Sequence, residues 1–214
     1  LDPYGRKIRT TNLPKNDKDY PYILEDTPNE MYEMEKGFAK AFGYKSPAFL
    51  LKNNSEFTKE NIDLWMDHVV SYGNLMMNVD YNTIGDQWVE QMLPHILSPT
   101  EDGVRRRLKE YMNWVKENKI KIEGFIDPEP SMIFHDRWIC YFARARVKFK
   151  ITSYNVEKDI LYMTIGKGKP LKKNVWYTGY VDLELFTNVG GVWGDTLRVS
   201  PNADIHHYSI LKKL

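Results

Sequence analysis

The sequence predicts an α+β domain in which helices come first and a curved antiparallel sheet packs against them. Apolar residues recur with helical spacing across residues 58–118, and from Ile120 onward they alternate with polar residues. Glycine-containing turns at 166–170 and 190–191 separate alternating segments. The helical period predicts helices with one buried face, and the period of two predicts strands with one face on the core.

The bulk composition fits one globular domain with an extension. The chain has 214 residues, a hydrophobic fraction of 42% and a formal charge of +1. A chain of this size can bury a core without disulfides or metals, and the only cysteine, Cys140, has no partner for an intramolecular bridge. The balanced charge argues against a dedicated nucleic-acid-binding protein, which needs a net basic face. We expect an arm at residues 1–55 and the domain at residues 56–214.

The arm lacks sustained periodicity and contains five prolines. One short helix is expected over residues 29–42, since Pro28 precedes it and Gly43 is suited to end it. Several tyrosines and phenylalanines of the arm indicate that it packs on a surface. That surface belongs either to its own domain or to a partner, and we favour the first, since most aromatic side chains are buried.

Three further helices are predicted from apolar spacing and start signals. The first covers residues 58–78, with Thr58 as its N-cap, and the second covers residues 84–93 and ends at Pro94. The third is expected to start at Ser98, which is followed by a proline and, three residues later, by Glu101. Its arginines at 105–107 largely face water in this interpretation.

The strands are predicted from alternation. The stretch 132–153 is too long for one flat strand, so a bend is expected near His135, Asp136 or Arg137. No stretch approaches the roughly 20 apolar residues that span a bilayer, and a membrane anchor before Leu1 is left open. The predicted strands are 120–126, 132–153, 159–166, 174–187, 192–199 and 204–211.

Two of these strands carry complementary charges on their polar faces. One has basic residues at 144, 146, 148 and 150, and the other has Asp182 and Glu184. If the strands are neighbours, the basic row lies beside the acidic row, and each cross-strand pair contributes about 0.2–1 kcal/mol. This structural interpretation competes with a catalytic one for the two carboxylates, and we favour the structural one.

Motifs that carry chemistry are sparse. No histidine pair has helical i,i+4 spacing, and the chain contains no HExxH, CxxC or GxSxG sequence. Cys140 lies inside a strand pattern, which favours a buried small side chain over a nucleophile. We therefore expect no metal, no cofactor and no catalytic residues. The residues that we expect to form an interface with other proteins are Tyr20, Tyr22, Arg105, Arg106, Trp176 and Tyr180.

A family resemblance adds to this interpretation. Helices followed by long antiparallel strands is the order of elements in nuclear-transport-factor-two-like (cystatin-like) folds. Within that group, residues 64–79, 88–97, 160–168 and 172–186 resemble the soluble domain of the bitopic inner-membrane components of type IV secretion systems, of the TraE type of conjugative transfer protein. The resemblance rests on the order of elements and on scattered residues, and it covers about two thirds of the chain.

The resemblance implies a non-enzymatic assembly factor at the periplasmic face of the bacterial inner membrane. Such a protein is anchored in the membrane, self-associates and contacts other subunits of the secretion channel. An alternative is a small-molecule-binding protein or enzyme on the same cone-shaped fold. That alternative needs a polar pocket inside the cone, which Tyr162, Trp176, Asp182 or His207 could line.

Overall fold

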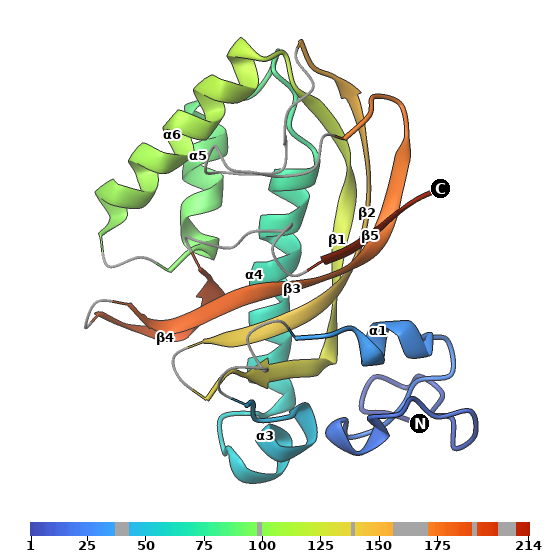
Figure 1. Ribbon diagram of the computed structural model, residues 1–214. Coiled ribbons are helices and arrows are strands. Elements are labelled where there is room, and N and C mark those ends of the chain that lie inside the picture. Colours follow the sequence, from blue (N-terminus) through green and yellow to red (C-terminus); the bar gives the residue numbers. More distant parts are fainter. Residues whose placement is uncertain (37–42, 98–99, 138–139, 156–170, 190–191, 201–208) are drawn as a thin grey trace.

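The protein is an α+β domain in which helices cover one face of a curled antiparallel sheet and an N-terminal arm covers part of the other (Figure 1). This computed structural model describes all residues except 37–42, 98–99, 138–139, 156–170, 190–191 and 201–208. The predicted class and the packing of helices on a curved antiparallel sheet are confirmed. No helix in the described part of the chain is both long and apolar enough to cross a membrane.

Helix α4, Lys59–Met77, is the central helix and packs on strands β1 and β4. Its N-cap is Thr58, as predicted, and the Thr58 side chain accepts a hydrogen bond from the amide of Asn61. The buried side chains recur every three or four residues, which gives one apolar stripe toward the sheet. Gly73 lies on this stripe where a Cβ atom would come within 2.6 Å of the Ile126 Cβ, so only glycine allows α4 to approach β1 this closely.

The helices α5, Asp86–Met92, and α6, Glu101–Glu117, complete the helical layer. Pro94 lies in the short 3-10 helix η2, Leu93–His95, which follows α5 as the proline predicts. The predicted start of α6 is wrong by two residues, because the N-cap is Thr100 rather than Ser98. Residues 98–99 lie outside the described part of the chain.

In its described residues the arm contains the short helices α1, Asn29–Glu33, and α3, Pro47–Asn53, and the 3-10 turn η1, Asp17–Asp19. Of the helix predicted over residues 29–42, the first part ends at Glu33, because Met34 leaves the helical conformation with φ −54° and ψ 125°. Residues 37–42 of that prediction lie outside the described residues. The sequence analysis missed α3. Its start has the same Ser-Pro signal that was recognised at Ser98, since the Ser46 side chain accepts a hydrogen bond from the amide of Phe49.

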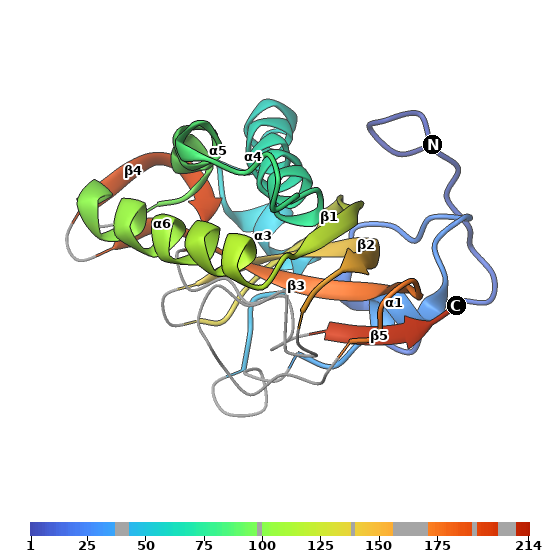
Figure 2. The same cartoon turned by 90° about the horizontal axis from the view of Figure 1, so that it is seen from above.

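Where the chain is described, the sheet has five antiparallel strands: β1, Lys121–His135; β2, Tyr141–Ser153; β3, Trp176–Val189; β4, Val192–Val199; and β5, Ser209–Lys213. Strands β1 to β4 are neighbours in chain order. Strand β5 pairs with the start of β3, from Tyr177 to Val181, while β4 pairs with its end. Figure 2 shows β1, β2 and β3 between the helical layer and α1.

Two strand predictions need correction. The stretch 132–153 is not one bent strand, because the chain reverses in a hairpin after His135 and its two parts belong to β1 and β2. The predicted strand 120–126 continues through an irregular region after Pro128 to form the first part of β1. The predicted strand at 159–166 and most of that at 204–211 lie outside the described residues.

The inner face of the sheet and the helices share one apolar core. Side chains at alternate positions of β2, including Ala143, Ala145, Val147 and Phe149, are at most 1% exposed and contact the buried stripes of the helices. The alternation in the sequence predicted this face correctly. The opposite, outer face of β2 carries Arg144, Arg146, Lys148 and Lys150, whose cross-strand partners on β3 are Asp182, Tyr180, Thr178 and Trp176.

The outer edge of β1 is closed by groups other than a strand. The side-chain amide of Asn78 donates to the Gly124 carbonyl at 2.9 Å and accepts from the Gly124 amide at 3.3 Å, as a neighbouring strand would. The Ile122 amide bonds the Val79 carbonyl at 2.9 Å. Farther along, prolines at 128 and 130 lack the amide hydrogen that strand pairing needs.

Candidate functional site: the outer face of the sheet

A buried ion pair lies at the centre of the outer face. Arg144 and Asp182 are direct cross-strand neighbours, and their side chains are joined by two parallel hydrogen bonds of 2.7 Å each. Neither side chain has any exposed surface. The predicted pairing of a basic and an acidic row is therefore confirmed at this position, but the pair is buried beneath the arm instead of facing water.

The arm is held over this pair by the remaining donors of Arg144. Its Nη1 atom donates to the Met31 carbonyl at 2.8 Å and to the Tyr32 carbonyl at 3.3 Å. These two carbonyls lie in α1, so the guanidinium connects α1 to the sheet. A buried charge is tolerated only when its hydrogen-bonding groups are satisfied, and the arm supplies the acceptors that Asp182 leaves open.

A second apolar cluster surrounds the pair. It consists of Tyr20, Ile23, Met31 and Tyr32 from the arm and Met132 from β1. The rings of Tyr20 and Tyr32 meet edge to face with 4.8 Å between their centroids. The arm therefore packs on its own domain, which is the alternative that the sequence analysis favoured.

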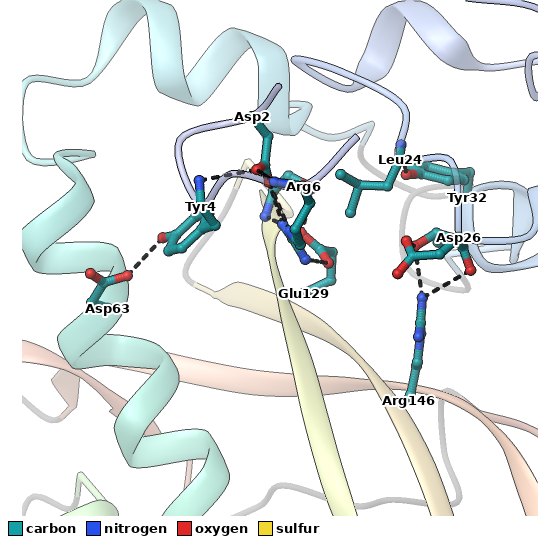
Figure 3. A network of polar contacts seen from close by, with 11 residues as sticks. Asp2, Tyr4, Arg6, Leu24, Asp26, Tyr32, Asp63, Glu129 and Arg146 are labelled. Atoms are coloured by element: carbon teal, nitrogen blue, oxygen red, sulfur yellow. Dashed lines mark hydrogen bonds and ion pairs between the residues drawn. The ribbon is translucent and has the colours of Figure 1, made fainter. Parts of the chain in front are cut away.

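The first residues of the arm form a polar network at the border between sheet and helices (Figure 3). The Arg6 guanidinium donates to both oxygens of the Glu129 carboxylate, at 2.7 and 2.9 Å, and its Nε donates to Asp2 at 2.8 Å. The Tyr4 hydroxyl donates to the Asp63 carboxylate of α4 at 2.7 Å. The arm is thereby tied to β1 and to the central helix.

Lys36 occupies an aromatic box at the other end of the arm. Its Nζ lies 4.6, 5.2 and 5.9 Å from the ring centroids of Tyr44, Phe134 and Tyr20, and the residue is 8% exposed. Burial and then the nearby charge of Arg144 lower the pKa of Lys36 to about 8. Three cation–π contacts offset part of the cost of burying this ammonium group.

The covering by the arm ends at Arg146. Its Nη2 donates to the Thr27 hydroxyl at 2.7 Å and to the Asp26 carbonyl at 3.5 Å (Figure 3). Beside it, a groove of about 350 Å³ lies between the arm at Asp26, Pro28 and Glu30 and strand β5 at Lys212. Its floor includes Thr178 and Tyr180 of β3.

Beyond Arg146 the outer face has aromatic and cationic side chains that the arm does not cover. Phe125 of β1 is 45% exposed. The Lys148 and Lys150 ammonium groups lie 5.1 and 4.8 Å from the ring centroid of Trp176. Lys150 also forms an ion pair with Glu123. We call this part of the sheet, made of Phe125, Lys148, Lys150 and Trp176, the open patch.

The predicted interface residues fall into two groups, of which the aromatic ones lie on this side of the sheet. Tyr20 is a residue of the arm and is buried in the second apolar cluster, while Tyr180 lines the groove and packs against that cluster. Tyr22 is half-buried, and burial, followed by the charges of Asp2 and Glu129, raises its pKa to about 12. Trp176 lies in the open patch.

The two predicted arginines lie on the helical layer, away from these residues. Arg105 forms an ion pair with Glu90 of α5 and another with Glu101 of its own helix, α6. Arg106 is largely exposed, and its Nε lies 4.0 Å from the Glu110 carboxylate. Since exposed ion pairs within and between helices contribute little, these arginines have no special environment in the structure.

Three residues of the open patch, Phe125, Lys148 and Lys150, were not singled out from the sequence. The alternation in 120–126 contained the signal for Phe125, because Ile122 and Ile126 are buried while Phe125, in the opposite phase, faces outward. The two lysines were recognised only as members of the basic row.

The interior between helices and sheet is lined by apolar side chains in the described part of the chain. Of the residues expected to line a polar pocket there, Trp176 and Asp182 lie on the outer face instead. Tyr162 and His207 lie outside the described residues. Among the described residues no three histidine, cysteine or carboxylate side chains are placed to hold a metal ion.

Cys140 and a pair of histidines, His68 and His95, lie apart from the open patch. The Cys140 thiol donates to the Glu184 carboxylate at 3.2 Å, and burial together with that negative charge raises the pKa of the thiol. A thiol held protonated is a poor nucleophile. The Nδ1 atoms of His68 and His95 lie 3.0 Å apart, which requires that at least one of the two rings is neutral.

Comparison of the chain with family models, with curated proteins and with solved structures finds no significant match. The fold and the outer face therefore define the class on their own. The described chain is an α+β domain with an apolar core between helices and sheet. The outer face of the sheet carries cationic and aromatic side chains and is covered in part by the arm.

Proposed function

We propose that this chain is a non-enzymatic, protein-binding component of a larger assembly, and that it binds its partner through the open patch. The observation that carries the proposal is the partial covering of the outer face. The arm buries the half that contains Arg144, whereas Phe125 and Trp176 in the other half are left accessible or partly accessible. Aromatic side chains flanked by cations are enriched in protein interfaces.

The apolar interior supports a binding function over a catalytic one. Ligand pockets of cone-shaped folds need polar groups that converge inside the cone. The side chains that point there from β2 and β3 include Ala145, Phe149 and Leu183, all of them buried in the core. The buried charged pair, Arg144 and Asp182, is fully engaged in holding the arm.

We further propose that the assembly is a bacterial type IV secretion or conjugation machine, with the domain at the periplasmic face of the inner membrane. This placement rests on the resemblance to TraE-type components. Its partners are then other subunits of the secretion channel and further copies of the chain. Genes for a secretion ATPase and for pore subunits are expected beside the gene that encodes this chain, and a neighbourhood without them contradicts the placement.

The binding proposal is tested by site-specific photo-crosslinking in cells of the organism whose genome carries the gene for this chain. A benzoylphenylalanine is introduced at Phe125 in the open patch or, as a matched control, at Leu64, which is 46% exposed on α4. Adducts with one or a few defined proteins are expected from position 125 and not from position 64. The proposal is wrong if position 125 gives no protein adduct, or if both positions give the same set.

A further inference from the structure

The outer face of β2 presents one row of four cations, two of which show what the row binds. Arg144 and Arg146 donate hydrogen bonds to carbonyl oxygens of the arm, at Met31 and at Asp26, and Arg146 also bonds the Thr27 hydroxyl. This half of the row therefore holds a polypeptide segment against the sheet. The next two cations, Lys148 and Lys150, continue the row at the same spacing of two residues.

No segment of the arm bonds this second half in the described part of the chain. Lys150 is neutralised by Glu123, its neighbour on β1. Lys148 contacts the Trp176 ring but forms no ion pair among the described residues. On β1 its cross-strand neighbour is the exposed ring of Phe125. Within the described part of the chain, the open patch thus offers one ammonium group without an ion-pair partner, between two aromatic side chains.

The balance of charge around the patch indicates the class of partner. Lys212 is paired with Glu30 at 2.5 Å, and Asp127 lies opposite Arg146 in the strand register. A nucleic acid needs several uncompensated cations along its phosphates. One carboxylate, in contrast, matches the charge that is left at Lys148.

We infer that the open patch binds an extended, acidic segment of a partner protein, with a carboxylate at Lys148 and an apolar or aromatic side chain against Phe125 and Trp176. The groove beside Tyr180 receives the part of the segment that approaches the arm. The arm and the partner segment then occupy the two halves of one polypeptide-binding face. This inference rests on the proposed function and adds the chemistry of the partner.

Two synthetic peptides of twelve residues test the inference on the full chain. The first contains glutamates alternating with leucine and tryptophan around a central proline, and the second has lysine at each glutamate position. The acidic peptide is expected to shift the amide resonances of residues 146–150 and 176–178. Its affinity should fall at least about tenfold in Lys148→Glu, which corresponds to about 1.4 kcal/mol.

The controls separate charge at this site from charge in general. Lys148→Gln should weaken binding less than Lys148→Glu, and Lys116→Glu, at an exposed lysine of α6, should leave it unchanged. Melting temperatures of the variants equal to that of the wild type show that the fold is kept.

Four results overturn the inference: equal binding of the lysine peptide, an equal loss in Lys116→Glu, tighter binding of a twelve-nucleotide thymidine strand, or no binding of the acidic peptide at all. If the acidic peptide does not bind but photo-crosslinking from position 125 still gives protein adducts, the acidic partner is rejected and the proposed protein-binding function stands. If photo-crosslinking from position 125 gives no adducts either, the proposed function itself is rejected.

Discussion

Replacing Asp182 with alanine removes one partner of the ion pair that lies beneath the arm. Arg144 then keeps its bonds to the arm carbonyls but carries a charge without a counterion in a place with no exposed surface. Loss of one partner of a buried pair costs about 3–5 kcal/mol. Since 1 kcal/mol shifts the melting temperature of a domain of this size by about 2–4 °C, the variant should melt roughly 6–20 °C lower.

The destabilisation caused by Asp182→Ala depends on whether the arm covers the ion pair, and this dependence gives a sharper test than the single variant. In a chain without residues 1–36, water reaches the pair, and an exposed pair contributes only about 0.2–1 kcal/mol. None of the apolar residues of the main core lies within residues 1–36, so the shortened chain is expected to fold, with lower stability. A double-mutant cycle that combines Asp182→Ala with deletion of residues 1–36 should therefore show a coupling of about 2–4 kcal/mol in the free energy of unfolding.

The measurement is urea unfolding followed by tryptophan fluorescence. All six tryptophans lie outside the arm, so the signal reports on the helices and the sheet. Limited proteolysis of the arm provides the second observable and should speed up in Asp182→Ala. The reasoning fails if Asp182→Ala costs less than about 1 kcal/mol in the full chain, or if its cost is the same with and without the arm.

Two further predictions concern the core and the response to pH. Gly73→Ala should destabilise the protein by about 1–2 kcal/mol, since overpacking against Ile126 outweighs the gain in helix propensity. Gly103→Ala should be neutral or stabilising, because the added methyl group meets only the Thr100 side chain. Equal thermal stability of the two variants contradicts this prediction. Burial, followed by the charge of Arg198, lowers the pKa of His95 below its usual 6.5, so the unfolded chain binds a proton before the native one does and stability falls as pH drops through 6.5. His95→Gln should flatten this fall between pH 7.5 and pH 5.5 in urea unfolding, and an unchanged slope shows that His95 is not its source.

Local periodicity was sufficient to predict the central helix and the phase of the strands. The stripe of α4 and the alternation in β2 are both consequences of one buried face, and this face can be recognised without knowledge of the partner element. The N-cap at Thr58 was predictable for the same reason, because its hydrogen bond to Asn61 is local. Helix α3 was missed although its Ser-Pro start was present.

The covering of the outer face could not be predicted in this way. Arg144 and Asp182 alternate with apolar residues and so appeared to face water, whereas their burial depends on a segment more than a hundred residues away in the chain. Tyr20, which was expected to contact other proteins, is buried against its own domain by the same tertiary contact. Proximity of the arm to β2 is a tertiary contact, and nothing in the local pattern of either segment encodes it.

The closed edge of β1 limits how copies of this chain can meet. Where the Asn78 amide and the prolines at 128 and 130 occupy the border of the sheet, a strand from another molecule finds few free backbone groups to pair with. Continuous sheets that run from one molecule to the next are therefore disfavoured on this side. A copy of the chain that meets this edge therefore finds side chains to contact rather than a free row of backbone donors and acceptors.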